Sequence, residues 1–277
     1  MTTQSLKRTT AGTELVRALA QEGRRIFTIK EARELAPAVG LSLDYLPESL
    51  HHLSRTGWII RIKKGVYALS SSVPGTAPVH EFEIAMALVH PAAISHWSAL
   101  GYHGMTDQIP RRVFVLTTAH SVPRTRNKTR TADEEGYAVG DTVYQFAKTK
   151  PERFFGIEDV WVNESRIKMT DPERTLLDGL STPRYFGDFA EVLHAFEVHL
   201  PKLKLDRMVA YALKLDNAIS KRLGWILERQ GIEANRLNQL REVPIKGYRV
   251  LDPSSPRFGR YNSEWMIQVN LPGEAKK

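Results

Sequence analysis

Two carboxylates, Asp171 and Glu173, are the residues with the most obvious capacity for chemistry. Closely spaced acidic side chains can hold the metal ion of a nuclease. Here Pro172 lies between them, and Thr170 and Glu173 have the spacing of a capping box, so the pattern favours a helix start. No lysine follows at the short spacing of such nucleases, and the chain lacks a phosphate-cradling glycine loop and a serine nucleophile elbow. We predict no catalytic residue.

The histidines do not indicate a metal site. His51 and His52 are adjacent and would face different directions on a helix, whereas His96 and His103 are seven residues apart with no carboxylate at ligand spacing. The sequence has no cysteine, which excludes disulfides and cysteine-based zinc sites and fits a reducing compartment. We predict no metal and no cofactor.

Basic residues give a stronger signal. The 277-residue chain has a formal net charge of +8 and a pI of about 9.6, which favours a polyanionic partner. Residues 1–79 contribute +5 and residues 111–130 contribute +6, so the rest of the chain is net negative at −3. Nucleic-acid contacts are therefore expected in these two segments.

The first basic segment contains an amphipathic helix followed by a hairpin. Residues 42–56 predict a helix that Ser42 caps and Gly57 ends, with an apolar stripe of leucines at alternating three- and four-residue steps. The stripe consists of Leu43, Leu46, Leu50 and Leu53. Residues 58–62 and 66–69 predict two strands joined by a turn in which Gly65 permits a positive φ. This succession is typical of the end of a winged helix-turn-helix.

The preceding residues complete the same domain. Residues 1–11 are polar and are expected to be disordered, and residues 12–22 predict a helix that Gly23 closes. Residues 26–29 can add a third strand beside the wing. Thr28 and Glu31 have capping-box spacing, which predicts a second helix over residues 29–36 that ends at Pro37.

In a winged helix the second helix of the motif is presented to the major groove, and the hairpin reaches a phosphate or the minor groove. Solvated surface charge is the plain alternative. Carboxylates on the outer face would repel phosphate but can accept hydrogen bonds from cytosine, so they would select sequence. The candidate DNA-binding residues are Thr28, Lys30, Asp44, Tyr45, Glu48, Ser49, His52, Arg55, Arg61, Lys63 and Lys64.

A stretch rich in Ser, Pro and Gly at residues 70–78 predicts a linker. We expect a winged-helix domain at 1–72, a linker at 73–78 and a second domain at 79–277. The hydrophobic share of 42% is sufficient for more than one core. No apolar run approaches the ~18 to 20 residues of a membrane span, and the expected location is cytoplasmic.

The second domain mixes the two types of element. Helices are expected at 80–89, from Ser95, from Thr170 and in three stretches between 189 and 230 that are split near Pro201 and Asp216. Strands are expected at 113–117, 143–147, 159–162 and 166–169, with a further strand in 251–270. The predicted fold class is α+β multidomain: an N-terminal winged helix-turn-helix, then a mixed α/β domain with a helical subregion.

The second basic segment adds +6 in twenty residues without an acid. Its residues 121–130 predict a loop. The charges of this loop are either solvated, or they form a second nucleic-acid contact, or they belong to a surface with a further function. Its basic residues are Arg111, Arg112, Arg124, Arg126, Lys128 and Arg130.

Several segments together resemble the AbiEi-type antitoxins of type IV toxin–antitoxin and abortive-infection systems, which act in phage defence. They cover most of the chain in the matching order. They are RIKKGVYAL (61–69), ISHWSALGYHGM (94–105), RRVFVLT (111–117), KMTDPERTLLDGL (168–180), SKRLGWILERQG (220–231) and RVLDPSSPRFGRYNSEWMIQVN (249–270).

The resemblance implies an N-terminal domain that binds repeated operator sites near its own promoter and represses the operon. It also implies a C-terminal α/β antitoxin domain that counteracts a nucleotidyltransferase-like toxin, with or without stable contact, and it implies that the protein is not an enzyme. The second basic segment would then belong to the antitoxin surface or to an auxiliary one. The operator sequence cannot be carried over, because residues 40–49 and the N-terminal extension do not match the family residue by residue.

The sequence is also compatible with two alternatives. One is a winged-helix regulator whose large domain senses a small ligand, and a toxin-like nucleotidyltransferase encoded next door would argue against it. The other is a nuclease that uses the winged helix for targeting, for which metal-dependent cleavage of plasmid DNA would be the signature.

Overall fold

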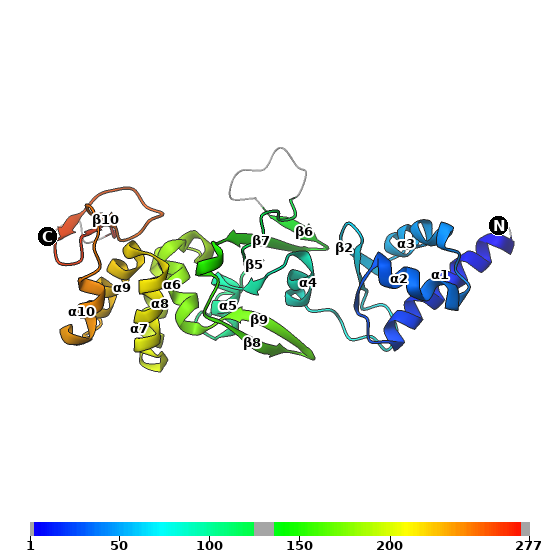
Figure 1. Ribbon diagram of the computed structural model, residues 1–277, viewed down its shortest axis with the longest axis horizontal. Helices are drawn as coiled ribbons and strands as arrows, with labels where there is room; N and C mark the ends of the chain where they lie inside the picture. Colours follow the sequence, from blue (N-terminus) through cyan, green and yellow to red (C-terminus); the bar gives the residue numbers. More distant parts are fainter. Residues whose placement is uncertain (1–2, 125–135, 273–277) are drawn as a thin grey trace. The chain divides into compact units, whose positions relative to one another are not determined.

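The computed structural model describes residues 3–124 and 136–272. The chain divides into two compact units (Figure 1). Unit 1 comprises Met1–Ala92, Ala119–Gln145 and Trp161–Ile167, and unit 2 comprises Ala93–Thr118, Phe146–Val160 and Lys168–Lys277. The predicted division at residues 73–78 stays a prediction about how the chain separates in solution.

Unit 1 begins with three helices and a three-stranded sheet. The helices are α1 (Thr3–Gln21), α2 (Ile29–Leu35) and α3 (Leu46–Arg55), and the strands are β1 (Ile26–Thr28), β2 (Ile59–Lys63) and β3 (Val66–Leu69). The sheet has the order β1-β3-β2, with antiparallel pairing throughout. The predicted third strand beside the hairpin is therefore confirmed, and the element order is consistent with a winged helix.

Two local predictions for this region were wrong. The segment expected to be disordered is helical from Thr3, because residues 3–11 contain neither Gly nor Pro and can extend a helix that the buried Leu15 and Leu19 anchor. The helix expected over 42–56 is shorter, because Pro47 favours the first turn and α3 begins at Leu46. A 3-10 turn at Leu43–Tyr45 precedes it, Ser42 makes no side-chain cap, and Leu43 is 49% exposed.

The remaining leucines of the predicted stripe, Leu46, Leu50 and Leu53, are buried in one core with α1 and the sheet. Val73, in the stretch predicted as a linker, is also buried in this core. Beyond that stretch, the Arg25 guanidinium forms an ion pair of 2.8 Å with Glu83. Helix α4 (Glu81–Leu88) is thus fastened to the small sheet by contacts inside unit 1.

A six-stranded sheet has the order β6-β7-β5-β4-β9-β8. Its strands are β4 (Ala93–Ile94), β5 (Arg112–Thr117), β6 (Tyr137–Val139), β7 (Thr142–Lys148), β8 (Ile157–Val162) and β9 (Ser165–Thr170). β4 is antiparallel to β5 and parallel to β9. The four strands predicted between 113 and 169 are confirmed as β5, β7, β8 and β9, and the helix from Ser95 is α5 (His96–Tyr102).

Unit 2 contains the helical subregion. Its helices are α6 (Pro172–Ser181), α7 (Phe189–His199), α8 (Leu205–Leu215), α9 (Asn217–Arg229) and α10 (Asn238–Arg241). Its 3-10 turns lie at Pro151–Arg153, Pro183–Phe186, Leu200–Lys202 and Ala234–Leu237, and a further one at Ala36–Val39 belongs to unit 1. The predicted breaks near Pro201 and Asp216 are confirmed, since α7 ends at His199, α8 ends at Leu215 and α9 begins at Asn217 (Figure 1).

A second small sheet, with the order β10-β12-β11, ends the chain. Its strands are β10 (Arg249–Val250), β11 (Arg260–Asn262) and β12 (Ile267–Val269). Trp265 packs on α9 at Gly224, where a Cβ would lie 2.0 Å from the indole ring. The indole Nε1 donates to Glu228 at 2.8 Å, so the buried ring is packed against α9 and its polar N–H is hydrogen-bonded.

Candidate nucleic-acid interface and a buried charge network

Helix α3 presents one polar face to solvent. Leu46, Leu50 and Leu53 fix the opposite face in the core of unit 1. The outward residues are then set by helical geometry. Asp44, Tyr45, Glu48 and Arg55 are exposed, whereas Ser49 and His52 are half-buried. The structure therefore brings all six predicted residues of this segment to one exposed region, and their contact with DNA stays a prediction.

The hairpin after α3 is held in a fixed position. Gly65 has a φ of +76°, which glycine adopts readily. Its carbonyl accepts a hydrogen bond of 2.8 Å from the N–H of Ile29 at the start of α2. The hairpin tip and the beginning of α2 therefore stay together, which places the predicted contact residue Lys30 near the wing.

The basic residues of the hairpin differ in their availability. Arg61 and Lys64 are exposed, and within the described part of the chain neither forms an ion pair. Lys63 is half-buried, and its ammonium donates to the carbonyl of Leu88, the last residue of α4, at 3.0 Å. The strand pairing is irregular between Arg61 and Lys63. Such a bulge changes the direction of the side chains, which accounts for the different exposure of the two residues.

Thr28 is similarly engaged. Its hydroxyl donates to the Glu31 carboxylate at 2.7 Å and accepts from the Glu31 N–H at 3.2 Å, so the predicted capping box is confirmed. The Thr28 N–H also donates to the Glu31 carboxylate at 2.7 Å, and this bond, followed by the one from the hydroxyl, lowers the pKa of Glu31. A DNA contact by Thr28 would have to share the hydroxyl with the cap.

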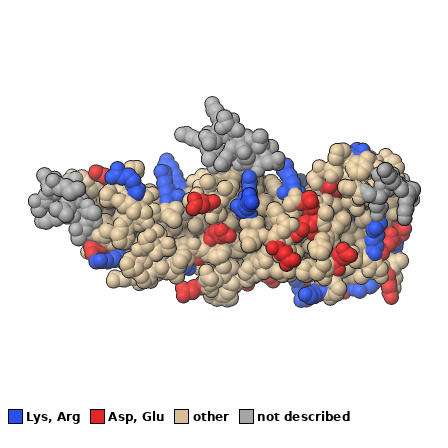
Figure 2. Space-filling model, turned by 180° about the vertical axis from the view of Figure 1, so that it is seen from behind, with Lys and Arg blue, Asp and Glu red and all other residues tan. Residues whose placement is uncertain are grey.

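The second basic segment is only partly described. Arg111 is exposed, and Arg112 is half-buried at the first position of β5. Arg124 is exposed, whereas Arg126, Lys128 and Arg130 lie outside the described residues. On the face that Figure 2 shows, Lys and Arg side chains are separated by Asp, Glu and neutral residues.

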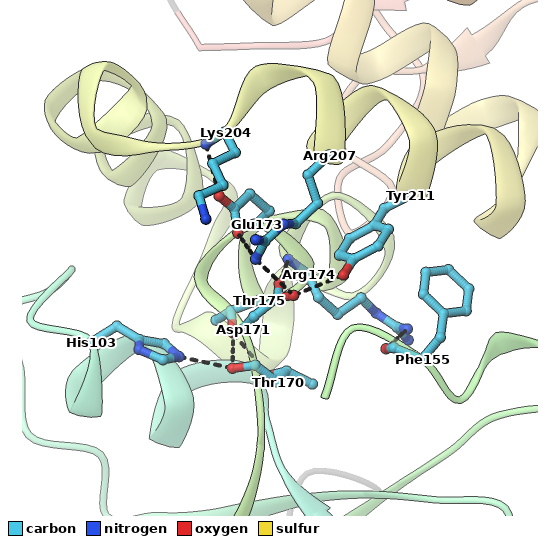
Figure 3. Close-up of polar contacts among 10 residues, drawn as sticks. All are labelled: His103, Phe155, Thr170, Asp171, Glu173, Arg174, Thr175, Lys204, Arg207 and Tyr211. Carbon is cyan, nitrogen blue, oxygen red and sulfur yellow. Dashed lines mark hydrogen bonds and ion pairs between the residues drawn. The ribbon is translucent and has the colours of Figure 1, made fainter. Parts of the chain in front are cut away.

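In unit 2, charged side chains gather where α6 begins, facing α8 (Figure 3). Asp171 is the N-cap of α6, and its carboxylate accepts from the N–H of Arg174 at 2.8 Å. Pro172 occupies the first turn, as predicted. The predicted capping box is wrong, because Glu173 accepts from the N–H of Lys204 at 2.7 Å and from Arg207 at 3.3 Å instead of bonding back.

Arg174 is the most deeply buried cation of this network, at 1% exposure. Its guanidinium donates to Asp178 at 2.9 Å and to the carbonyls of Arg153 and Phe155 at 2.8 and 2.7 Å. It also lies 4.8 Å from the centre of the Phe155 ring. A single side chain thus joins α6 to the segment between β7 and β8.

Burial raises the pKa of the Asp171 carboxyl, although the hydrogen bond from Arg174 opposes this shift. Tyr211 donates to the same carboxylate at 2.9 Å, and burial together with that bond raises the pKa of Tyr211 to about 12. Each oxygen of Asp171 and Glu173 already accepts a hydrogen bond within unit 2. Among the described residues no group of three potential ligands could hold a metal ion.

This arrangement suits a structural network better than a catalytic one. A nuclease pair needs carboxylate oxygens that are open to a metal, and these oxygens are turned toward α8 and the helix's own N-terminus. Nothing in the local sequence marks Arg207 and Tyr211 as partners, because they lie on another helix. The buried Arg174 could have been noticed only as the residue that follows the cap.

Residues 14–70 match a family model described as transcriptional regulator, AbiEi antitoxin. The resemblance expected from the sequence is confirmed over this segment. The match includes the C-terminal part of α1, together with α2, α3 and the three-stranded sheet, so the AbiEi-type segment coincides with the candidate interface. The match is limited to this segment, and it supports a DNA-binding regulator of the antitoxin type.

A solved structure with a similar fold spans most of the chain. It is the crystal structure of the RV2827C protein from Mycobacterium tuberculosis, with a TM-score of 0.65, 16% sequence identity and coverage of 93% of this chain and 90% of that one. At this identity the likeness shows the fold alone. No curated protein matches the chain. In the described residues, no helix is both long and apolar enough to cross a bilayer.

Proposed function

We propose that this chain is a transcriptional repressor and antitoxin that binds operator DNA near its own promoter and counteracts a nucleotidyltransferase-like toxin. The observation that carries the DNA-binding half is the pairing of an outward polar helix face with a fixed basic hairpin in the AbiEi-type segment. α3 would read base edges in the major groove, and the wing would contact phosphate.

Tyr45 and Arg55 are the proposed reading residues, because both are exposed on or directly before α3. Asp44 and Glu48 are exposed on the same segment. They carry the wrong charge for phosphate but can accept from cytosine, so their proposed role is selection between sequences. Ser49 and His52 can add hydrogen bonds to the DNA.

Arg61 and Lys64 are the proposed phosphate contacts, since both are exposed without an ion pair in the described region. Lys30 adds a third cation near the hairpin tip. Neutralising a phosphate releases condensed counterions, so these residues would supply affinity for all sequences and make it dependent on salt. Lys63 and Thr28 are secondary, because their polar atoms are already hydrogen-bonded.

A gel-shift or anisotropy titration tests this division of roles. Duplexes from upstream of the gene are compared with random duplexes of the same length. Arg55→Ala or Tyr45→Ala should reduce the preference for the cognate duplex by about 5- to 150-fold, the range of one good base contact. Arg61→Ala with Lys64→Ala should weaken binding to both duplexes and lower the salt slope by about 1.8.

Lys202→Ala provides the matched control, because Lys202 is an exposed lysine in unit 2. It should leave preference and salt slope unchanged. If the α3 and wing variants bind as the wild type does, the proposed interface is wrong.

The antitoxin half is tested by growth. The full chain is co-expressed with the adjacent open reading frame, and rescue is scored alongside a promoter reporter. The α3 and wing variants should lose repression and keep rescue, because the antitoxin role is proposed for the region after residue 79. Reversal of Arg124, Arg126, Lys128 and Arg130 to Glu should reduce rescue if the second basic segment serves the antitoxin surface. Absence of rescue by the wild-type chain would overturn the antitoxin proposal.

A further inference from the structure

The small C-terminal sheet carries exposed aromatic and basic side chains that the proposed function does not use. Tyr261 on β11 is 63% exposed and Phe258, just before that strand, is 36% exposed. Four cations in the same segments are exposed, and we call the whole set the aromatic–basic surface. It consists of Lys246, Tyr248, Arg249, Arg257, Phe258, Arg260 and Tyr261.

The cations of this surface are not neutralised locally. Asp252 is the sole acid in residues 245–262, and it is 7% exposed. Its carboxylate is used by Ser254 and Ser255, whose hydroxyls donate to it at 2.6 Å. The nearby Glu264 is paired with Arg241 at 2.7 Å. In the described residues none of the four cations of the surface has an ion-pair partner, so an anionic ligand would meet uncompensated positive charge.

The backbone beneath the surface is held in place. Gly259 has a φ of +85°, and a Cβ there would lie 2.0 Å from the carbonyl oxygen of Val269. The buried Asn270 side chain donates to the carbonyls of Asp252 and Pro256 at 2.9 and 3.0 Å. These contacts fix the chain on both sides of Phe258, so its exposure is a property of a fixed loop.

The aromatic rings are also ordered relative to each other. Tyr261 lies opposite Gln268 of the central strand β12. The rings of Tyr248 and Tyr261 have centroids 4.7 Å apart and planes at 61°, an edge-to-face pair. Tyr261 is thereby oriented by a neighbour and still keeps most of its surface in solvent.

We propose that the aromatic–basic surface binds single-stranded nucleic acid. Bases would stack on Tyr261 and Phe258, and Arg257 and Arg260, which are adjacent to these two residues in the sequence, would contact the phosphates. Aromatic platforms flanked by cations are the general means of holding unpaired strands, because every base offers a stacking face. A duplex has its base faces covered, and an acidic peptide would need the cations but not the exposed rings. This role is separate from duplex reading by α3 and the wing.

The test uses the full-length protein with fluorescent 12-nucleotide oligo-dT and oligo-U and with a random duplex. Tyr261→Ala combined with Phe258→Ala should weaken binding to the single strands at least about tenfold, since one stacked base accounts for ~5- to 150-fold. Duplex affinity should change by less than about twofold. Tyr261→Phe keeps the stacking face and should bind single strands as the wild type does.

Reciprocal variants separate this surface from the proposed operator interface. Arg61→Ala with Lys64→Ala should weaken duplex binding and spare single-strand binding. Arg257→Ala with Arg260→Ala should lower the salt slope for single strands by about 1.4, at ~0.7 per contact. Tyr102→Ala, at an exposed tyrosine on α5, is the aromatic control.

The proposal is overturned if the wild type binds neither oligonucleotide, or if the Tyr261 and Phe258 double variant binds single strands normally. It is also overturned if Tyr102→Ala causes the same loss, or if the double variant loses duplex binding equally. Unchanged melting temperatures confirm that each variant is folded.

Discussion

The winged-helix region and the start of α6 both concentrate charge, but they differ in where the charge lies. On α3 and the wing, Arg55, Arg61 and Lys64 are exposed. At the start of α6, Arg174 and Asp171 are buried. The Arg174 N–H donates to Asp171, and the Arg174 guanidinium donates to Asp178. A ligand can reach the first group without breaking a contact inside the protein, whereas the carboxylate oxygens of Asp171 and the guanidinium of Arg174 already bond to groups within unit 2.

This difference decides which region serves binding and which serves architecture. Exposed charges add little to stability and much to the attraction of a polyanion. Buried ion pairs roughly break even against hydrophobic packing, but removing one partner leaves an uncompensated charge. Variants of the two regions should therefore separate stability from affinity.

Arg174→Ala should cause the largest loss of stability. It would leave Asp178 buried with an uncompensated charge, and one oxygen of Asp178 already lacks a hydrogen-bond partner in the described structure. The expected cost is about 3 to 5 kcal/mol of unfolding free energy, measured by urea denaturation. Lys168→Ala removes the exposed ion pair with Asp159 and should cost about 0.5 kcal/mol. Equal losses in the two variants would mean that burial does not distinguish these pairs.

Two helical glycines extend the comparison to packing. Gly224→Ala would place a Cβ 2.0 Å from the Trp265 ring, so we expect a loss of about 3 kcal/mol from overpacking. The Cβ of Gly12→Ala on α1 would have Leu53 as its nearest neighbour, at an ordinary 3.8 Å, and the change should stabilise the protein by about 0.5 to 1 kcal/mol through helix propensity. Thermal denaturation should show a lower melting temperature for Gly224→Ala and a higher one for Gly12→Ala. An unchanged melting temperature of the Gly224→Ala protein would contradict the close packing at Trp265.

His96 should make stability depend on pH. Burial lowers the pKa of His96 from 6.5 to about 4. Between these two pH values His96 is protonated in the unfolded chain and neutral in the folded chain. Stability is therefore complete above pH 6.5 and falls as the pH drops toward 4, by about 2 kcal/mol between pH 7 and pH 5. His96→Asn suits the φ of +51° at this position and should remove that part of the slope in urea titrations. An unchanged slope would assign the pH dependence to other groups.

The sequence predicted local features correctly where the interacting residues are neighbours in the chain. The Thr28–Glu31 capping box and the glycine turn at Gly65 depend on a few adjacent residues. The sequence-based predictions failed where the interaction partner is distant in the chain. Glu173 bonds to Lys204 instead of its own helix end, and Val73 of the predicted linker is buried in the core of unit 1. Periodicity cannot show such pairings, because it reports which face is apolar and not what covers it.

The same limit applies to the candidate site. Exposure of the α3 face followed from the positions of Leu46, Leu50 and Leu53, which sequence periodicity identifies. Leu43 continues that periodicity and is nevertheless exposed, since Pro47 moves the helix start to Leu46. Arg174, Arg207 and Tyr211 could not be grouped from sequence, because α6 and α8 contribute them separately.

The two wing lysines give the smallest and most specific contrast. The sequence assigns Lys63 and Lys64 the same role, but Lys63 donates to the Leu88 carbonyl whereas Lys64 is exposed. Lys64→Ala should lower the salt slope of duplex binding by about 0.9 and leave stability unchanged. Lys63→Ala should leave the slope nearly unchanged and reduce stability by about 1 kcal/mol, because the C-terminal carbonyl of α4 loses its donor. Anisotropy titrations over a salt series and urea denaturation measure both quantities on the same samples. A loss of slope in Lys63→Ala equal to that in Lys64→Ala would show that Lys63 leaves Leu88 for phosphate when DNA binds.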